Sequence, residues 1–224
     1  MEVCIYIGVV YVTWQLCFLL IRKQDTFDAI CIAFCMRGPR IFSGIGIGIY
    51  AWMIRHAESD YLLTYVLAVV IAISLGCFIF AVFSDLAMQR VYRFCWYGVY
   101  GGCGILGILK YISTNVSAGE VCGNYLCDLF LFAFIQFVWF ERFYGRADCH
   151  GFFAGACILA LFDGSFWDYV MQMAYAFGIL LVIQLFRKNV NRRGNLKRTV
   201  AFLPYVAAGL LLRLAVLNPV QIVR

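Results

Sequence analysis

The feature that most constrains this chain of 224 residues is a series of long apolar runs separated by short charged stretches. The run Tyr61–Ser84 contains no charged side chain, and a helix needs about 20 mostly apolar residues to cross a bilayer. Hydrophobic residues make up 64% of the chain and charged residues 13%, against about 45–50% and about 25% in soluble domains. The sequence therefore predicts an all-α polytopic membrane protein, and it excludes soluble and disordered classes.

Apolar runs recur along the chain, and we expect a bundle of about seven transmembrane helices. One run, Ile41–Ile54, is short for a span. The runs are Val3–Ile21, Ile41–Ile54, Tyr61–Ser84, Phe94–Leu109, Tyr125–Phe140, Cys149–Phe162, Tyr169–Phe186 and Val200–Leu217. Pairs of small residues four apart predict close helix contacts, and these are Gly44/Gly48, Gly98/Gly102 and Gly151/Gly155.

Charge predicts the orientation of these spans. The stretch Arg187–Arg198 carries six Lys or Arg and no acid, so the positive-inside rule assigns it to the cytoplasm. Because successive spans alternate in direction, all the remaining basic clusters fall on the same side. The acidic loop Asp163–Asp168 and the N-terminus fall on the outside. The net charge of +6 is therefore explained by topology and by anionic lipid of the bilayer, and we expect no nucleic-acid partner.

Cysteine and histidine patterns offer no cofactor site. The chain has 11 cysteines and two histidines, without a CxxC pair, and most cysteines fall inside apolar runs. We interpret them as free thiols that fill helix contacts. The predicted topology separates His56 from His150, so neither a metal site nor a Ser/His/Asp triad has enough members. We expect no metal and no cofactor.

Acids in or beside apolar runs are the candidates for chemistry, because a membrane carboxylate is costly and usually functional. Asp85 ends one run and Asp148 opens another, at the same cytoplasmic depth. Two carboxyl groups that meet suit acid/base hydrolysis, because one holds a proton while the other stays ionised. The alternative is two unrelated helix-end acids. Asp128 lies near the start of a helix, where the helix dipole favours an acid, and we interpret it as structural.

At these residues the sequence resembles the bacterial type IV prepilin peptidases, which are GxGD-type membrane aspartic proteases related to preflagellin peptidase. Three segments carry the resemblance, in the order and spacing of the family. They are Phe83-Ser84-Asp85-Leu86, Tyr144-Gly145-Arg146-Ala147-Asp148, and the stretch from Arg198 through Pro204 to Gly209. The second is similar to the Gly-x-Gly-Asp or Gly-x-Ala-Asp motif of the family.

The resemblance implies a membrane aspartic endopeptidase that removes the short basic leader of a prepilin-like protein at the cytoplasmic face of a bacterial plasma membrane. Asp85 and Asp148 would be the catalytic pair. Gly145 and Ala147 would be the small residues that let substrate approach the backbone closely. Pro204 would interrupt a helix near the site. Residues 61–224 would form a six-helix catalytic core, and residues 1–60 an N-terminal extension with one or two spans.

Departures from the family keep two rival functions open. Val91-Tyr92-Arg93 replaces the usual Ile-Pro-Asn, and His150 stands where lysine is common. The cysteine-bearing insert associated with methyltransferase activity is missing, so we expect no methylation. One rival is a catalytically inactive relative that binds pilin-type helices. The other is a proton- or cation-coupled transporter, for which acids near the membrane midplane and repeated halves are typical.

Overall fold

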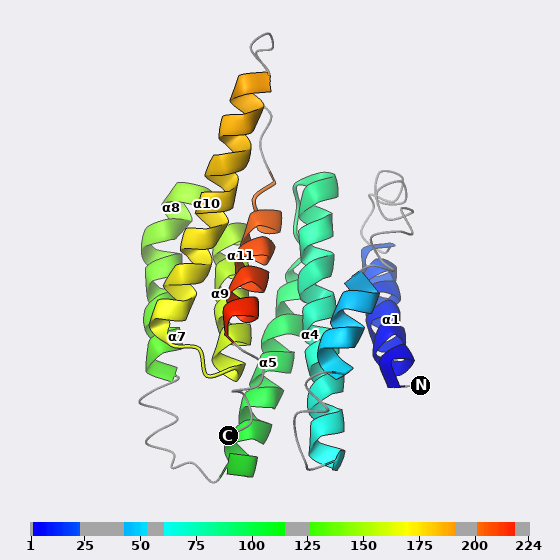
Figure 1. Cartoon of the computed structure of the whole chain (residues 1–224). Coiled ribbons are helices and arrows are strands. Elements are labelled where there is room, and N and C mark those ends of the chain that lie inside the picture. Colours follow the sequence, from blue (N-terminus) through cyan, green and yellow to red (C-terminus); the bar gives the residue numbers. More distant parts are fainter. Residues whose placement is uncertain (1, 23–42, 53–60, 115–125, 191–200, 218–224) are drawn as a thin grey trace. The chain divides into compact units, whose positions relative to one another are not determined.

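The computed structural model describes residues 2–22, 43–52, 61–114, 126–190 and 201–217 (Figure 1). Apart from short turns these residues are helical, and no strand occurs among them. The predicted all-α class is therefore confirmed. The chain divides into two compact units, Met1–Val121 with Pro219–Arg224, and Cys122–Asn218. The predicted boundary between an extension and a catalytic core at residue 60 stays a prediction.

The first unit is built from three long helices and a shorter helical segment at residues 43–52. The long helices are α1 (Glu2–Arg22), α4 (Tyr61–Met88) and α5 (Arg93–Thr114). Trp14 of α1 contacts the rings of Phe80 and Phe83 on α4, with centroids 5.7 and 5.4 Å apart. Aromatic contacts of this kind fix α1 against the half of α4 that leads to Asp85.

The second unit contains a nearly continuous helix formed by three successive elements, followed by three further helices. The elements are α7 (Cys127–Phe134), the π-helical turn η2 (Ile135–Phe140), α8 (Glu141–Tyr144), α9 (Arg146–Leu161), α10 (Phe166–Val190) and α11 (Leu203–Val216). The predicted run Tyr125–Phe140 thus continues as helix to Tyr144. The apolar pattern ends at Phe140 because Glu141 and Arg142 are charged, although the backbone stays helical.

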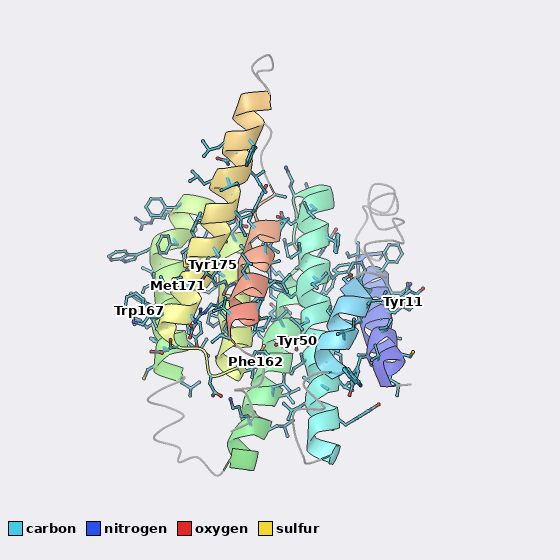
Figure 2. All side chains as sticks on the ribbon, viewed as in Figure 1. Tyr11, Tyr50, Phe162, Trp167, Met171 and Tyr175 are labelled. Atoms are coloured by element: carbon cyan, nitrogen blue, oxygen red, sulfur yellow. The ribbon has the colours of Figure 1, made fainter. Side chains whose placement is uncertain are left out.

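One face of α10 is buried and another is exposed. Figure 2 shows Trp167, Met171 and Tyr175 following one another along this helix, and the side chain of Trp167 is 73% exposed. Asp168 and Gln172, one residue after Trp167 and Met171, are buried. In a membrane helix, the exposed apolar face is the one that meets lipid, and the buried face meets the bundle.

Three of the described helices are long and apolar enough to cross a membrane. They contain the candidate spans Val3–Ile21, Tyr65–Leu86 and Phe166–Phe186. These agree with three of the predicted runs, and they support a membrane protein. The prediction of about seven spans is not confirmed: α9 and α11 have 16 and 14 residues, fewer than the about 20 that a full crossing needs.

The predicted small-residue pairs do lie at helix contacts. A Cβ atom on Gly98 would meet Sγ of Cys77 at 2.6 Å, and one on Gly48 would meet Cγ1 of Ile7 at 2.7 Å. A Cβ atom on Gly151 would lie 3.2 Å from Cδ1 of Leu203. At Gly48 and Gly98 a larger side chain would therefore force a neighbour to shift, and at Gly151 it would be tightly packed, in agreement with the predicted close helix contacts.

The described cysteines are free thiols. Five of them are buried in the helix bundle, namely Cys17, Cys77, Cys95, Cys103 and Cys149. For these five the prediction that thiols fill helix contacts is confirmed. Cys4 and Cys127 are exposed.

Candidate functional site

Asp85 lies in the last turn of α4, in the first unit. The residue is 9% exposed, whereas its neighbour Leu86 is 53% exposed. The helix ends because Gln89 adopts a φ of 53°, and its N–H donates to the Asp85 carbonyl oxygen at 2.8 Å. The structure therefore holds a buried carboxyl group at the end of a membrane-length apolar helix. Burying an acid there costs free energy, and acids at such positions usually mark functional sites.

The turn that carries Asp85 is tightly packed. Ser84 is fully buried, and its hydroxyl donates to a carbonyl of its own helix at 2.8 Å. On the same stretch of α4, Phe80 and Phe83 contact Trp14 of α1. These contacts pack the residues just before Asp85 against α1, and they limit how far the backbone there can shift.

Asp148 lies in the first turn of α9, in the second unit. Gly145 separates α8 from α9 with a φ of 93° and a ψ of 160°. Its N–H donates to the Glu141 carbonyl at 3.2 Å, and its own carbonyl accepts the N–H of Cys149 at 3.3 Å. One residue thus ends one helix and begins the next. This break places Asp148 at a helix N-terminus, where the helix dipole favours a carboxylate.

The two small residues before Asp148 are exposed. Gly145 and Ala147 are both on the surface of the second unit, and Asp148 is half-buried. A Cβ atom on Gly145 would meet no atom within 4 Å. Glycine is required here by its positive φ, because other residues rarely adopt this backbone conformation. The predicted close approach of substrate at both positions stays a prediction.

Pro204 stands in the first turn of α11, which begins at Leu203 after Phe202. Proline suits this position because a first-turn N–H has no partner within the helix. The expectation that Pro204 interrupts a helix is therefore wrong, since Pro204 begins one. The predicted run from Val200 was continuous in hydropathy, so the sequence pattern did not show where the helix starts.

An aromatic cluster joins the start of α11 to α8, α9 and α10. The ring of Phe202 lies 6.0 Å from that of Tyr144, 5.7 Å from Phe152 and 5.3 Å from Phe177, measured between centroids. Tyr144 directly precedes Gly145. The cluster therefore brings the turn of Pro204 to the same end of the second unit as the turn of Asp148.

The structure thus brings four of the five predicted site residues into one unit. Gly145, Ala147 and Asp148 share one turn, and Pro204 lies in a helix that packs on it. Asp85 belongs to the other unit. The meeting of the two carboxyl groups therefore stays a prediction.

Two buried amides, those of Gln136 and Gln172, were not among the residues singled out in the sequence. Both are 0% exposed, in η2 and α10. Their only signal in the sequence is a polar amide inside an apolar run. In a membrane protein such an amide, like an acid, is costly to bury. Gln136 is hydrogen-bonded to the Tyr144 hydroxyl, whereas Nε2 and Oε1 of Gln172 have no hydrogen-bond partner among the described residues.

Two other predicted residues have structural contacts. Asp128 accepts the backbone N–H of Phe166 at 2.9 Å, so it caps the start of α10, in agreement with the structural interpretation. The rings of His150 and Phe137 pack edge to face, with their centroids 4.8 Å apart.

Among the residues that the structure describes, no group of three or more His, Cys, Asp or Glu side chains has the geometry to hold a metal ion. Comparisons of the chain with family models, curated proteins and solved structures find no significant match. The family resemblance therefore rests on the three sequence segments alone.

Proposed function

We propose that this protein is a membrane aspartic endopeptidase in which Asp85 and Asp148 form the catalytic pair. The substrate class is a prepilin-like protein of a type IV pilus or a related secretion system, with a short basic leader followed by an apolar helix. Residues 61–224 supply the catalytic core. The protein acts in a bacterial plasma membrane, with its active site toward the cytoplasm.

The observation that carries the proposal is the burial of Asp85. The residue is 9% exposed in the last turn of α4, a helix that contains the candidate span Tyr65–Leu86. An acid in this setting is costly and marks a functional site by default. The second carboxyl group, that of Asp148, is presented at a helix N-terminus after a glycine break. These are two different local environments, as a pair with different protonation states needs.

Hydrolysis requires one carboxylate and one carboxylic acid. The carboxylate removes a proton from water, and the resulting hydroxide adds to the scissile carbonyl carbon while the acid donates its proton to the carbonyl oxygen. The tetrahedral adduct then collapses: the C–N bond breaks, the amine leaves with a proton from the pair, and one hydroxyl proton of the adduct returns to the pair, which restores one acid and one carboxylate. Which aspartate starts as base is left open, because coupled carboxyl groups share their protonation steps.

Co-expression with a prepilin-like protein tests the proposal. Loss of the leader is read as a gel shift, and insertion of each variant is checked in isolated membranes. We expect Asp85→Asn and Asp148→Asn each to abolish processing, because either change removes one half of the acid/base pair. Processing at the wild-type rate by either variant would contradict the proposal.

A matched control is available in the same unit. Asp163 has a φ of 55°, a conformation that asparagine tolerates well, so Asp163→Asn makes the same chemical change without backbone strain. We expect this variant to process substrate at the wild-type rate.

A further inference from the structure

A buried glutamine lies beside the helix that carries Asp148. Gln136 is 0% exposed, and an amide in apolar surroundings is costly unless it is hydrogen-bonded. Its Nε2 donates to Sδ of Met173 on α10 at 2.8 Å, and its Oε1 accepts from the Tyr144 hydroxyl. Its backbone carbonyl accepts the thiol of Cys149 at 3.3 Å. One residue is therefore bonded to α8, α9 and α10.

Two of these bonds lie on either side of the turn that carries Asp148. Tyr144 directly precedes Gly145, and Cys149 directly follows Asp148. Glycine places few limits on its own backbone, so contacts from outside the turn must fix its conformation. Gln136 supplies one such contact before Gly145 and one after Asp148.

The π-helical turn η2 gives Gln136 this reach. The N–H of Glu141 donates to the Gln136 carbonyl, which is the five-residue spacing of a π-helix. The same carbonyl accepts the Cys149 thiol, so the turn is bonded along its own helix and across to α9. Single π-turns are rare and occur frequently at functional sites.

Tyr144 is held as a hydrogen-bond donor. Its ring lies 5.6 Å from that of Phe152 and 6.0 Å from that of Phe202, between centroids. Burial raises the pKa of the Tyr144 phenol well above its ordinary range. The hydroxyl therefore keeps its proton, and it donates to Gln136 at any physiological pH.

We propose that Gln136 is the positioning residue for Asp148, and that it acts through its bonds to Tyr144 and Cys149. This inference rests on the proposed peptidase function and deepens it. Gln136 does not touch the reacting atoms. It fixes the turn between α8 and α9, and that turn sets where the Asp148 carboxyl group meets water and substrate. A shift of about 1 Å in a catalytic group costs about a hundredfold in rate, so a loosened turn lowers catalysis even in a folded protein.

Steady-state cleavage by the full chain in lipid vesicles, with a prepilin-like substrate, tests this role. Tyr144→Phe removes only the hydroxyl, and Gln136→Met removes the amide while keeping its length. We expect each to lower kcat at least about tenfold and to leave KM within about twofold, because substrate binding is unchanged while the Asp148 carboxyl group is misplaced. Gln172→Met is the matched control, since it removes a buried amide that has no partner among the described residues, and it should keep the wild-type kcat.

The double variant Gln136→Met/Tyr144→Phe separates positioning from folding. It leaves neither partner of this bond as a buried unpaired polar group. If the pair were merely structural, the double variant would therefore recover kcat. We expect the double variant to have a kcat as low as the single variants. Recovery of kcat in the double variant, or wild-type kcat in both single variants, would overturn the proposal.

Hydrogen exchange of the amides at residues 145–149, measured by mass spectrometry on the full chain in lipid nanodiscs, gives a readout without proteolysis. We expect faster exchange in Gln136→Met and Tyr144→Phe than in the wild type or in Gln172→Met. Unchanged exchange in both variants overturns the positioning role. Faster exchange in a chain that cleaves no prepilin-like substrate supports the positioning role and contradicts the peptidase, so the two failures are distinguishable.

Discussion

At the scale of single residues, Gly145 has the most demanding backbone conformation near the candidate site. Its φ of 93° and ψ of 160° belong to a region that is essentially restricted to glycine. A Cβ atom there would meet no neighbour within 4 Å, so the requirement comes from the backbone and not from packing. A substitution at this position therefore tests conformation alone.

We expect Gly145→Ala to destabilise the protein by about 1–3 kcal/mol, the usual cost of such strain. Unfolding in detergent micelles, followed by circular dichroism, measures this change. Gly178→Ala on α10 is the control: a Cβ atom there also meets nothing within 4 Å, but the site is helical, so alanine should stabilise it by up to about 1 kcal/mol. Equal free energies of unfolding for the two variants would contradict the conclusion that the α8–α9 break requires glycine.

At the scale of helices, the second unit joins α10 to α11 with a largely buried ion pair. Arg213 donates from Nη2 to Oδ1 of Asp168, and the two side chains are 18% and 11% exposed. Asp168 also accepts the N–H of Ser165 at 2.6 Å and its hydroxyl at 2.9 Å. The carboxylate therefore closes the first turn of α10 and holds the last turn of α11 against it.

We expect Arg213→Met to destabilise the protein by about 3–5 kcal/mol, because it leaves the buried Asp168 carboxylate without its counter-ion. The double variant Asp168→Asn/Arg213→Met should recover a large part of that loss, since it removes both charges. The same detergent unfolding measurement gives both values. If Arg213→Met were as stable as the double variant, the Asp168 carboxylate would not need its counter-ion. That result would contradict a buried ion pair.

Hydropathy alone could predict the helices α1, α4 and α10, because a long uncharged run has no other stable conformation in a bilayer. It could not locate the breaks. Gly145 is one of 20 glycines, and only its φ distinguishes it as the residue that ends α8. Pro204 lay inside an apolar run whose first helical residue was unknown, so a start was mistaken for an interruption.

The candidate site was predictable only in part, for a related reason. Asp85 and Asp148 stand out in the sequence as acids beside apolar runs. The partner of Asp128 does not, because Phe166 lies 38 residues away and the bond uses a backbone N–H. Gln136 was missed since an uncharged amide barely changes the hydropathy of its run, and its role depends on a π-turn that no simple periodicity reveals.

At the scale of the whole molecule, the proposed activity needs both units. Asp85 belongs to the first and Asp148 to the second, so the acid/base pair forms only if each unit contributes one carboxyl group to a single water molecule. The peptidase proposal therefore requires that the two units assemble with their carboxyl groups together, since neither unit carries both.

Cross-linking of the pair Asp85→Cys/Asp148→Cys in membranes tests this claim most directly, with a short bifunctional methanethiosulfonate reagent and detection of linked peptides by mass spectrometry. The control pair is Asp85→Cys/Asp163→Cys. Since α9 has 16 residues and rises about 1.5 Å per residue, positions 148 and 163 lie about 20 Å apart, and a short reagent cannot reach both from position 85. We predict rapid linkage of 85 to 148 and none of 85 to 163. Absence of the first linkage, or equal yields of both, would contradict the catalytic pair.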